Sequence, residues 1–98
     1  MMLIWTKESL ERLNEIGEYI GVNNPERAEK FVNYLIENAE SILDSPNIGR
    51  MVPDFADTRI REIIVKKYRI VYRVKAKTIE ILTVFEGHKS LNSDSFKI

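Results

Sequence analysis

The feature that most constrains the fold is a change in the spacing of hydrophobic residues about halfway along the 98-residue chain. Before residue 45, apolar side chains recur every three or four positions, which is the period of one face of an α-helix. After residue 59 they occur in short β-branched runs and, over residues 68–74, at every second position, which is the period of a β-strand. A chain with this pattern is expected to pack helices against one face of an antiparallel sheet, an α+β arrangement.

Two amphipathic helices are expected in the first half of the chain. Thr6 is a suitable N-cap for the first helix. The apolar face of that helix comprises Leu10, Leu13, Ile16, Tyr19 and Ile20. Asn24 and Pro25 are suited to cap and begin the second helix, whose apolar stripe extends over residues 28–43. Because the connection between them is short, the two helices are expected to form an antiparallel hairpin.

One strand is expected before the helices and three after them. The expected strands are residues 2–5, 60–65, 68–74 and 79–85, with residues 47–58 forming a loop. Short connections at Lys66-Lys67 and Ala76-Lys77 predict that the last three strands form an antiparallel meander. The helical hairpin covers one face of this sheet and leaves the other for solvent or a partner. All 98 residues are expected to form a single domain.

The composition excludes several classes of protein. The chain has no cysteine, so disulfides and thiolate metal sites are ruled out and a reducing cytoplasm is expected. With one histidine, His88, an ordinary zinc site is not expected, and no cofactor motif is present. No apolar stretch approaches the roughly 18–20 residues of a membrane helix, and the N-terminus does not resemble a signal peptide.

The net charge of zero hides a strong asymmetry along the chain. Residues 1–58 contain five basic and eleven acidic residues, a net charge of −6. Residues 59–77 contain eight basic residues against Glu62, a net charge of +7. The last 21 residues carry a net charge of −1. Since a partner responds to the local field, the segment 59–77 is the expected binding region.

Five short motifs occur in an order and at distances that together are specific. They are Asn24-Pro25, the run from Ser45 to Arg50, Ile60-Arg61-Glu62, the run from Lys67 to Val74, and the run from Ile81 to Lys89. With these motifs the chain resembles the RelE/ParE superfamily of toxins from type II toxin–antitoxin systems over nearly its whole length. Gly49-Arg50, followed by Val52-Pro53 and Arg61-Glu62, resembles the ParE branch most.

The resemblance implies a growth inhibitor with a cognate antitoxin as its partner in a toxin–antitoxin hetero-oligomer. ParE-type toxins act on DNA gyrase, whereas RelE-type toxins cut messenger RNA on the ribosome, and the fold does not decide between these activities. The near-zero net charge favours a gyrase-binding toxin without bond-making chemistry, since a ribosome binder is expected to be strongly basic. The alternatives are a ribosome-dependent mRNA endoribonuclease and an inactive homologue that only binds its antitoxin.

Four residues are catalytic candidates under the nuclease alternative. The resemblance places Arg69 at the arginine that stabilises the transition state and Lys89 at a second nuclease arginine, with Arg61 near a strand lysine. His88 is a candidate general acid or base because its pKa suits proton transfer at neutral pH. The family's late catalytic tyrosine has no counterpart, since the matching position is Ser95. This departure argues against the nuclease.

The expected binding residues are the basic side chains in and near the segment 59–77. They are Arg50, Arg61, Lys66, Lys67, Arg69 and Arg73, which suit phosphates or an acidic protein surface. Strand alternation places Arg69 and Arg73 on the open face of the sheet, with Arg61 a candidate to join them. The plainer interpretations are a solvated basic face, an Arg69 paired with an acidic neighbour, and an Arg50 that anchors its loop. Trp5, Tyr19 and Phe31 are interpreted as core residues.

Overall fold

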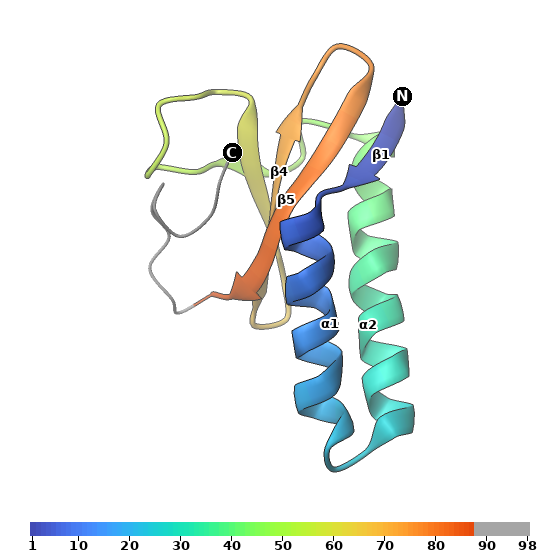
Figure 1. The fold of residues 1–98 in the computed structure, drawn as a ribbon. Coiled ribbons are helices and arrows are strands. Elements are labelled where there is room, and N and C mark those ends of the chain that lie inside the picture. Colours follow the sequence, from blue (N-terminus) through green and yellow to red (C-terminus); the bar gives the residue numbers. More distant parts are fainter. Residues whose placement is uncertain (88–98) are drawn as a thin grey trace.

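The computed structural model describes residues 1–87 and confirms the expected order of strand, helical hairpin and three antiparallel strands (Figure 1). Its elements are strand β1 (Met2–Trp5), helices α1 (Lys7–Gly21) and α2 (Pro25–Glu40), the 3₁₀ turn η1 (Ser41–Asp44), and strands β2 (Arg50–Met51), β3 (Ile60–Val65), β4 (Tyr68–Val74) and β5 (Thr78–Glu86). Neither helix within this range is long and apolar enough to cross a membrane.

The strands form one five-stranded sheet in the order β1-β5-β4-β3-β2. The expected meander of β3, β4 and β5 is confirmed, and β1 adds to its β5 edge in parallel. The prediction of an uninterrupted loop over residues 47–58 is wrong, because β2 pairs with Glu62 and Arg61 at the opposite edge. A strand of two residues has no periodicity, and only this long-range pairing defines it.

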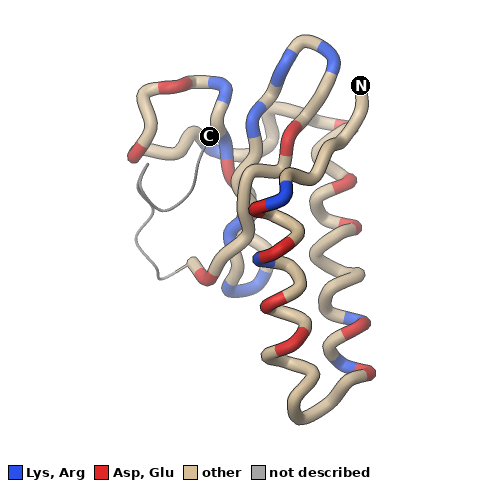
Figure 2. The backbone as a smooth tube through the Cα atoms, in the orientation of Figure 1, with Lys and Arg blue, Asp and Glu red and all other residues tan. Residues whose placement is uncertain are grey.

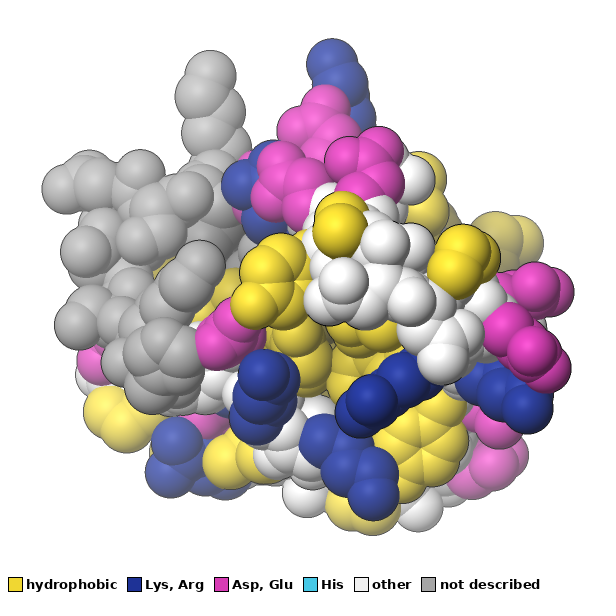
Figure 3. Space-filling view, turned by 90° about the horizontal axis from the view of Figure 1, so that it is seen from below, with side chains coloured by type: hydrophobic (Ala, Val, Ile, Leu, Met, Phe, Trp, Pro, Cys, Tyr) yellow, Lys and Arg dark blue, Asp and Glu magenta, His cyan; other side chains and the backbone are white. Residues whose placement is uncertain are grey.

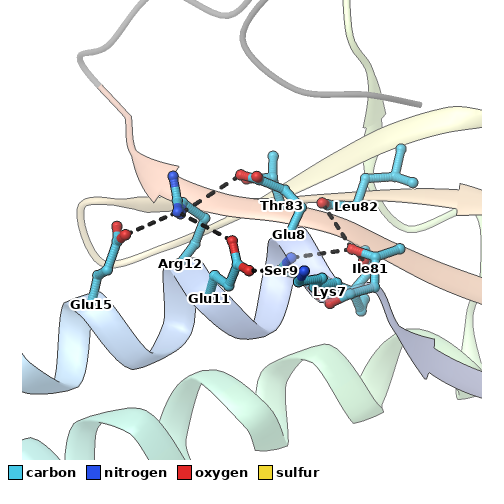
Figure 4. Close-up of polar contacts among 10 residues, drawn as sticks. Lys7, Glu8, Ser9, Glu11, Arg12, Glu15, Ile81, Leu82 and Thr83 are labelled. Atoms are coloured by element: carbon cyan, nitrogen blue, oxygen red, sulfur yellow. Dashed lines mark hydrogen bonds and ion pairs between the residues drawn. The ribbon is translucent and has the colours of Figure 1, made fainter.

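The N-terminus of α1 is fixed to the sheet as well as capped, and Figure 4 shows these contacts. The hydroxyl of Thr6 accepts a hydrogen bond from the Ser9 N–H at 3.1 Å, which confirms the predicted cap. The same hydroxyl donates to the carbonyl oxygen of Ile81 at 2.8 Å, on β5. Thr83 of β5 donates to the carboxylate of Glu8 at 3.2 Å. The start of α1 is therefore positioned by the strand that it packs against.

The helical hairpin covers one face of the sheet and encloses the main core (Figure 1). Its buried residues are Leu13, Ile16, Leu35, Ala39, Ile42, Val65, Tyr68, Ile70, Tyr72, Ile79, Ile81 and Val84. The first residues in this set come from the expected helical stripes and the others from alternate strand positions. The predicted hairpin is confirmed, and Asn24 caps its second helix by accepting from the Arg27 N–H at 3.0 Å.

The face of the sheet away from the helices has a second, smaller core. It consists of Val52, Ile60, Val71 and Leu82, with Phe55 and Phe85 packed against them. The expectation that this face is left open is therefore wrong in part, because the loop between β2 and β3 folds over it. This loop brings apolar residues to the same face as Arg69 and Arg73.

Candidate functional site

The basic segment 59–77 does not form one continuous basic surface. Figure 2 shows basic residues at both ends of β4 and acidic residues along α1. Within the segment, some cations meet carboxylates from neighbouring strands and others meet none. Each predicted binding residue therefore has to be considered with its own partners.

Glu62 on β3 is the centre of a buried ionic cluster. Its side chain has no exposed surface. One carboxylate oxygen accepts from Arg50 Nε at 2.6 Å, and the other accepts from Arg69 Nε at 2.7 Å. We call these three residues the Glu62 cluster. Since β3 places Glu62 opposite Val71, Arg69 reaches it along a diagonal between adjacent strands.

Arg69 is held on two sides. Besides its pair with Glu62, its guanidinium carbon lies 4.9 Å from the ring centroid of Phe85, in a cation–π contact. Only 12% of its side chain is exposed. To bind a phosphate directly, this guanidinium would have to leave a buried carboxylate without one of its partners, which is costly. Arg69 thus matches the plainer interpretation of an arginine paired with an acidic neighbour, although it is largely buried.

The loop before β2 is clamped by Tyr72. The Tyr72 hydroxyl donates to the Pro46 carbonyl at 2.8 Å and accepts from the Gly49 N–H at 2.9 Å. Burial raises the pKa of Tyr72, so its phenol stays neutral and its hydroxyl can both donate and accept a hydrogen bond. A side chain at Gly49 would collide with this hydroxyl, because an added Cβ would lie 2.6 Å from it. By fixing the loop at Pro46 and Gly49, the Tyr72 hydroxyl brings Arg50 to Glu62, which is a physical reason for the sequence from Pro46 to Arg50.

Arg61 does not join Arg69, contrary to the possibility drawn from strand alternation. It lies opposite Tyr72, whose ring belongs to the helix-side core, whereas Arg69 lies on the other face with Phe85. Its guanidinium donates to the Gly49 carbonyl oxygen at 2.7 Å. Arg61 therefore supports the same loop from the opposite side of the sheet to Arg69.

Three further basic residues of the segment are paired with carboxylates: Arg59, Arg73 and Lys75, the last with Glu80 at 3.2 Å. Arg73 lies directly opposite Glu80 on β5, and their charged atoms are 3.8 Å apart. Arg59 donates to Asp57 at 2.8 Å, and this hydrogen bond lowers the pKa of the Asp57 carboxyl from 3.8 to about 2. Arg69 and Arg73 do share the predicted face, and each lies against a carboxylate there. Glu62 is shared by Arg50 and Arg69, and Glu80 is shared by Arg73 and Lys75, so the positive charge of this face is offset only in part.

Lys66 and Lys67 differ from these arginines. They form the turn between β3 and β4, as predicted, and neither makes an ion pair with any residue in the range 1–87. The ammonium of Lys66 lies 5.7 Å from the ring centroid of Tyr34, and that of Lys67 lies 5.9 Å from the ring of Tyr68. Lys66 has a φ of 57°, a left-handed conformation that favours glycine. Arg61 also lacks a carboxylate partner among residues 1–87, but its guanidinium is hydrogen-bonded to the Gly49 carbonyl oxygen, whereas the two lysines have no side-chain hydrogen bond there.

Other predictions have mixed outcomes. His88 and Lys89 lie outside the described residues. Tyr19 was interpreted as core, which is wrong, because 73% of it is exposed. Trp5 and Phe31 do pack against the main core. The role of Glu62 was missed, since only the pairing of three strands reveals it. No cluster of potential metal ligands occurs between residues 1 and 87.

Comparison with known proteins gives three concordant results. The family model described as ParE toxin of type II toxin-antitoxin system, parDE, matches residues 3–91. The Y4kP protein of Sinorhizobium fredii, whose name describes it as a candidate toxin, is 33% identical over 85 residues, covering 87% of this chain and 86% of the relative. A structure of the chromosomal ParDE system from P. aeruginosa matches with a TM-score of 0.74 and 27% identity, over 88% of this chain and 95% of that one.

Proposed function

Because the chain belongs to the ParE toxin family of type II toxin–antitoxin systems, we propose that it arrests growth by binding DNA gyrase and that a cognate antitoxin neutralises it. ParE-type toxins act on gyrase, and the whole chain is taken to work as one toxin domain. The observation that carries this proposal is the state of Arg69. A guanidinium paired with a buried carboxylate and packed on an aromatic ring is a structural group, which favours a toxin that binds over one that cuts RNA.

The arrangement of Arg61 also disfavours the nuclease alternative. That alternative requires Arg61 and Arg69 to converge on one phosphate. In the structure they project from opposite faces of the sheet, and each is committed to a protein oxygen. The candidate nuclease set of Arg61, Arg69, His88 and Lys89 thus lacks a common site for the two members that the structure describes.

The antitoxin part of the proposal is supported by an open strand edge. Strand β2 pairs only with Arg61 and Glu62, so no strand of the described chain covers the outer edge of β3 at residues 63–65. Two exposed hydrophobic residues, Ile48 and Ile64, line a shallow pocket at this edge together with Ile63 and Val65. An uncovered edge with apolar neighbours suits the addition of an extended segment from a partner.

The direct test uses the purified protein in two assays. In a supercoiling assay with DNA gyrase, we expect dose-dependent inhibition; in a ribosome assay with messenger RNA, we expect no cleavage. Pulse labelling after induced expression should show thymidine incorporation falling before amino-acid incorporation. Cut messages with normal supercoiling would support the endoribonuclease instead. Uninterrupted growth without either effect would identify an inactive homologue.

The antitoxin is tested by expressing the chain with the product of the adjacent reading frame. Co-purification, restored growth and slower hydrogen exchange of the amides of residues 63–65 are expected in the complex. The amides of β1, at the other edge of the sheet, serve as the internal control. Growth restored without any change in exchange at residues 63–65 would place the antitoxin elsewhere on the toxin.

A further inference from the structure

The end of the molecule that carries the α1–α2 connection and the β3–β4 turn contains an open pocket of about 800 Å³. Its lining consists of Tyr19, Ile20, Val22, Asn23, Asn24, Arg27, Phe31, Lys66, Lys67 and Tyr68. Figure 3 views this end of the molecule and shows Lys and Arg side chains gathered around hydrophobic surface. The pocket lies between two segments distant in sequence, so it exists only in the folded chain.

Part of the hydrophobic lining of the pocket is exposed to solvent. Val22 is 81% exposed and Tyr19 is 73% exposed, both beside the α1–α2 connection. Phe31 and Tyr68 lie deeper, with ring centroids 5.4 Å apart. Exposed apolar and aromatic surface next to a hollow is characteristic of a site that receives a side chain from a partner.

The rim of the pocket is basic. Arg27, Lys66 and Lys67 all line it, and none of the three makes an ion pair within residues 1–87. The lysine at position 66 is kept in a left-handed conformation that glycine would adopt without strain. Without an ion pair in that range, the three charges are therefore available to a partner.

The lining also limits what the pocket can do. Its ionisable side chains are an arginine, two lysines and two tyrosines, without a carboxylate among them, so the charge that it offers a ligand is positive. A nucleic-acid backbone would need only the cations. Aromatic rings can stack on bases, but the aliphatic side chains of Ile20 and Val22 in the same lining suit a hydrophobic side chain of a protein segment whose acidic residues match the basic rim.

We propose that this basic-rimmed pocket is where the toxin docks on its protein target, by receiving an acidic segment that inserts an apolar or aromatic side chain. The inference rests on the proposed function in that the target is a protein. The charges of the rim attract the segment, and Tyr19, Val22 and Phe31 bury its hydrophobic side chain. The Glu62 cluster takes no part in this contact.

The charge of the rim is tested with a pair of matched variants in cells and with purified protein. Lys67→Glu reverses one charge of the turn at the pocket, and Lys77→Glu makes the same change in the β4–β5 turn, at the other end of β4; neither lysine makes an ion pair among residues 1–87. We expect the pocket variant to need at least tenfold more protein for half-maximal inhibition of gyrase and to lose growth arrest. The control variant should remain within about twofold of wild type in both readouts.

The hydrophobic part is tested on α1, with Tyr19→Ser in the pocket and Leu10→Ser, a 51% exposed position away from it, as control. Loss of growth arrest with Tyr19→Ser alone is expected. Arrest that depends on Lys67 but not on Tyr19 would indicate a phosphate-bearing partner and overturn the proposal. Equal behaviour of pocket and control variants would also overturn it.

The two readouts separate the pocket from the gyrase proposal. If the wild type arrests growth without inhibiting gyrase, the gyrase target is wrong, while a selective loss of arrest in the pocket variants still supports the pocket. If gyrase is inhibited equally by every variant, the target holds and the pocket is wrong. A wild type that arrests nothing overturns both.

Discussion

Arg69 of the Glu62 cluster and the Lys66–Lys67 turn come from the same basic stretch of sequence, residues 59–77, but have opposite surroundings. In the cluster, two arginines share a carboxylate that is fully buried. At the turn, two lysines contact aromatic rings and meet no carboxylate among residues 1–87. The two lysines form the turn of the hairpin closed by Val65 and Tyr68, so they lie only a few residues from Glu62 and Arg69 along the chain.

The difference shows that local net charge does not identify a binding surface by itself. A cation buried against a carboxylate contributes little field outside the protein and is committed to the fold, whereas an uncompensated one acts on a partner. Substitutions in the cluster should therefore change stability first. Substitutions at the turn should change binding first, and the predictions below test this division.

The largest expected effect is on stability, from Glu62→Gln. The amide keeps the shape of the side chain but removes the charge that both arginines share, leaving Arg69 buried without a counter-ion. We expect the free energy of unfolding to fall by about 4 kcal/mol, measured by urea denaturation. Glu37→Gln, at an exposed position on α2, is the control and should change it by less than about 0.5 kcal/mol. Similar small effects for both would mean that the cluster is not structural.

Gly49→Ala should disturb the same cluster by displacing the backbone of the loop that carries Arg50. The added Cβ would lie 2.6 Å from both the Glu62 carbonyl oxygen and the Tyr72 hydroxyl, so the loop has to move and Arg50 moves with it. The expected loss is about 3 kcal/mol in the same denaturation experiment. Gly21→Ala is the matched control, since its Cβ would be 3.5 Å from the Ala28 Cβ, an ordinary contact in a helical region. A Gly49→Ala protein as stable as Gly21→Ala would show that the Tyr72 clamp is dispensable.

Much of the fold was predictable because its signals are local. The helical stripes, the caps at Thr6 and Asn24 and the alternation of β4 are each contained within a few residues, and all three are confirmed. The strand β2 and the parallel pairing of β1 with β5 were not predicted. Both depend on contacts between distant segments, and β2 is too short to have a period.

The candidate site was less predictable for the same reason. Alternation along β4 correctly placed Arg69 and Arg73 on one face, but their carboxylate partners come from other strands. Glu62 reaches Arg69 only through the register of β3, and Glu80 faces Arg73 only through that of β5. A charge pattern read along one strand cannot include partners whose positions depend on pairing between strands.

Lys66→Gly should separate stability from function at the turn. Glycine adopts the left-handed conformation at position 66 without strain, so the free energy of unfolding should rise by about 0.5–1 kcal/mol. The same change removes a rim charge, so growth arrest should weaken although the protein becomes more stable. Lys67→Gly, outside the left-handed region, should remove a charge without the gain in stability. A destabilised Lys66→Gly protein would mean that the left-handed conformation of Lys66 does not reduce the stability of the wild type.

The smallest effect concerns Asp57 and Arg59. This pair has a carboxylate partner, as the arginines of the Glu62 cluster do, but it lies at the surface, as the lysines of the turn do. Because the hydrogen bond from Arg59 lowers the pKa of Asp57 from 3.8 to about 2, the pair contributes its stabilisation fully above pH 4 and loses it as the pH falls toward 2. An NMR titration of the Asp57 carboxyl should give a midpoint near 2 in the wild type. In Arg59→Gln the midpoint should return toward 3.8, with little change in unfolding at neutral pH because solvent screens this exposed pair. A midpoint unaffected by Arg59→Gln would assign the low pKa to another cause. A large loss of stability in Arg59→Gln would mean that this pair supports the fold as the Glu62 cluster does. The comparison of the two pairs therefore tests whether an arginine of this segment must be buried, and not only paired, to stabilise the protein.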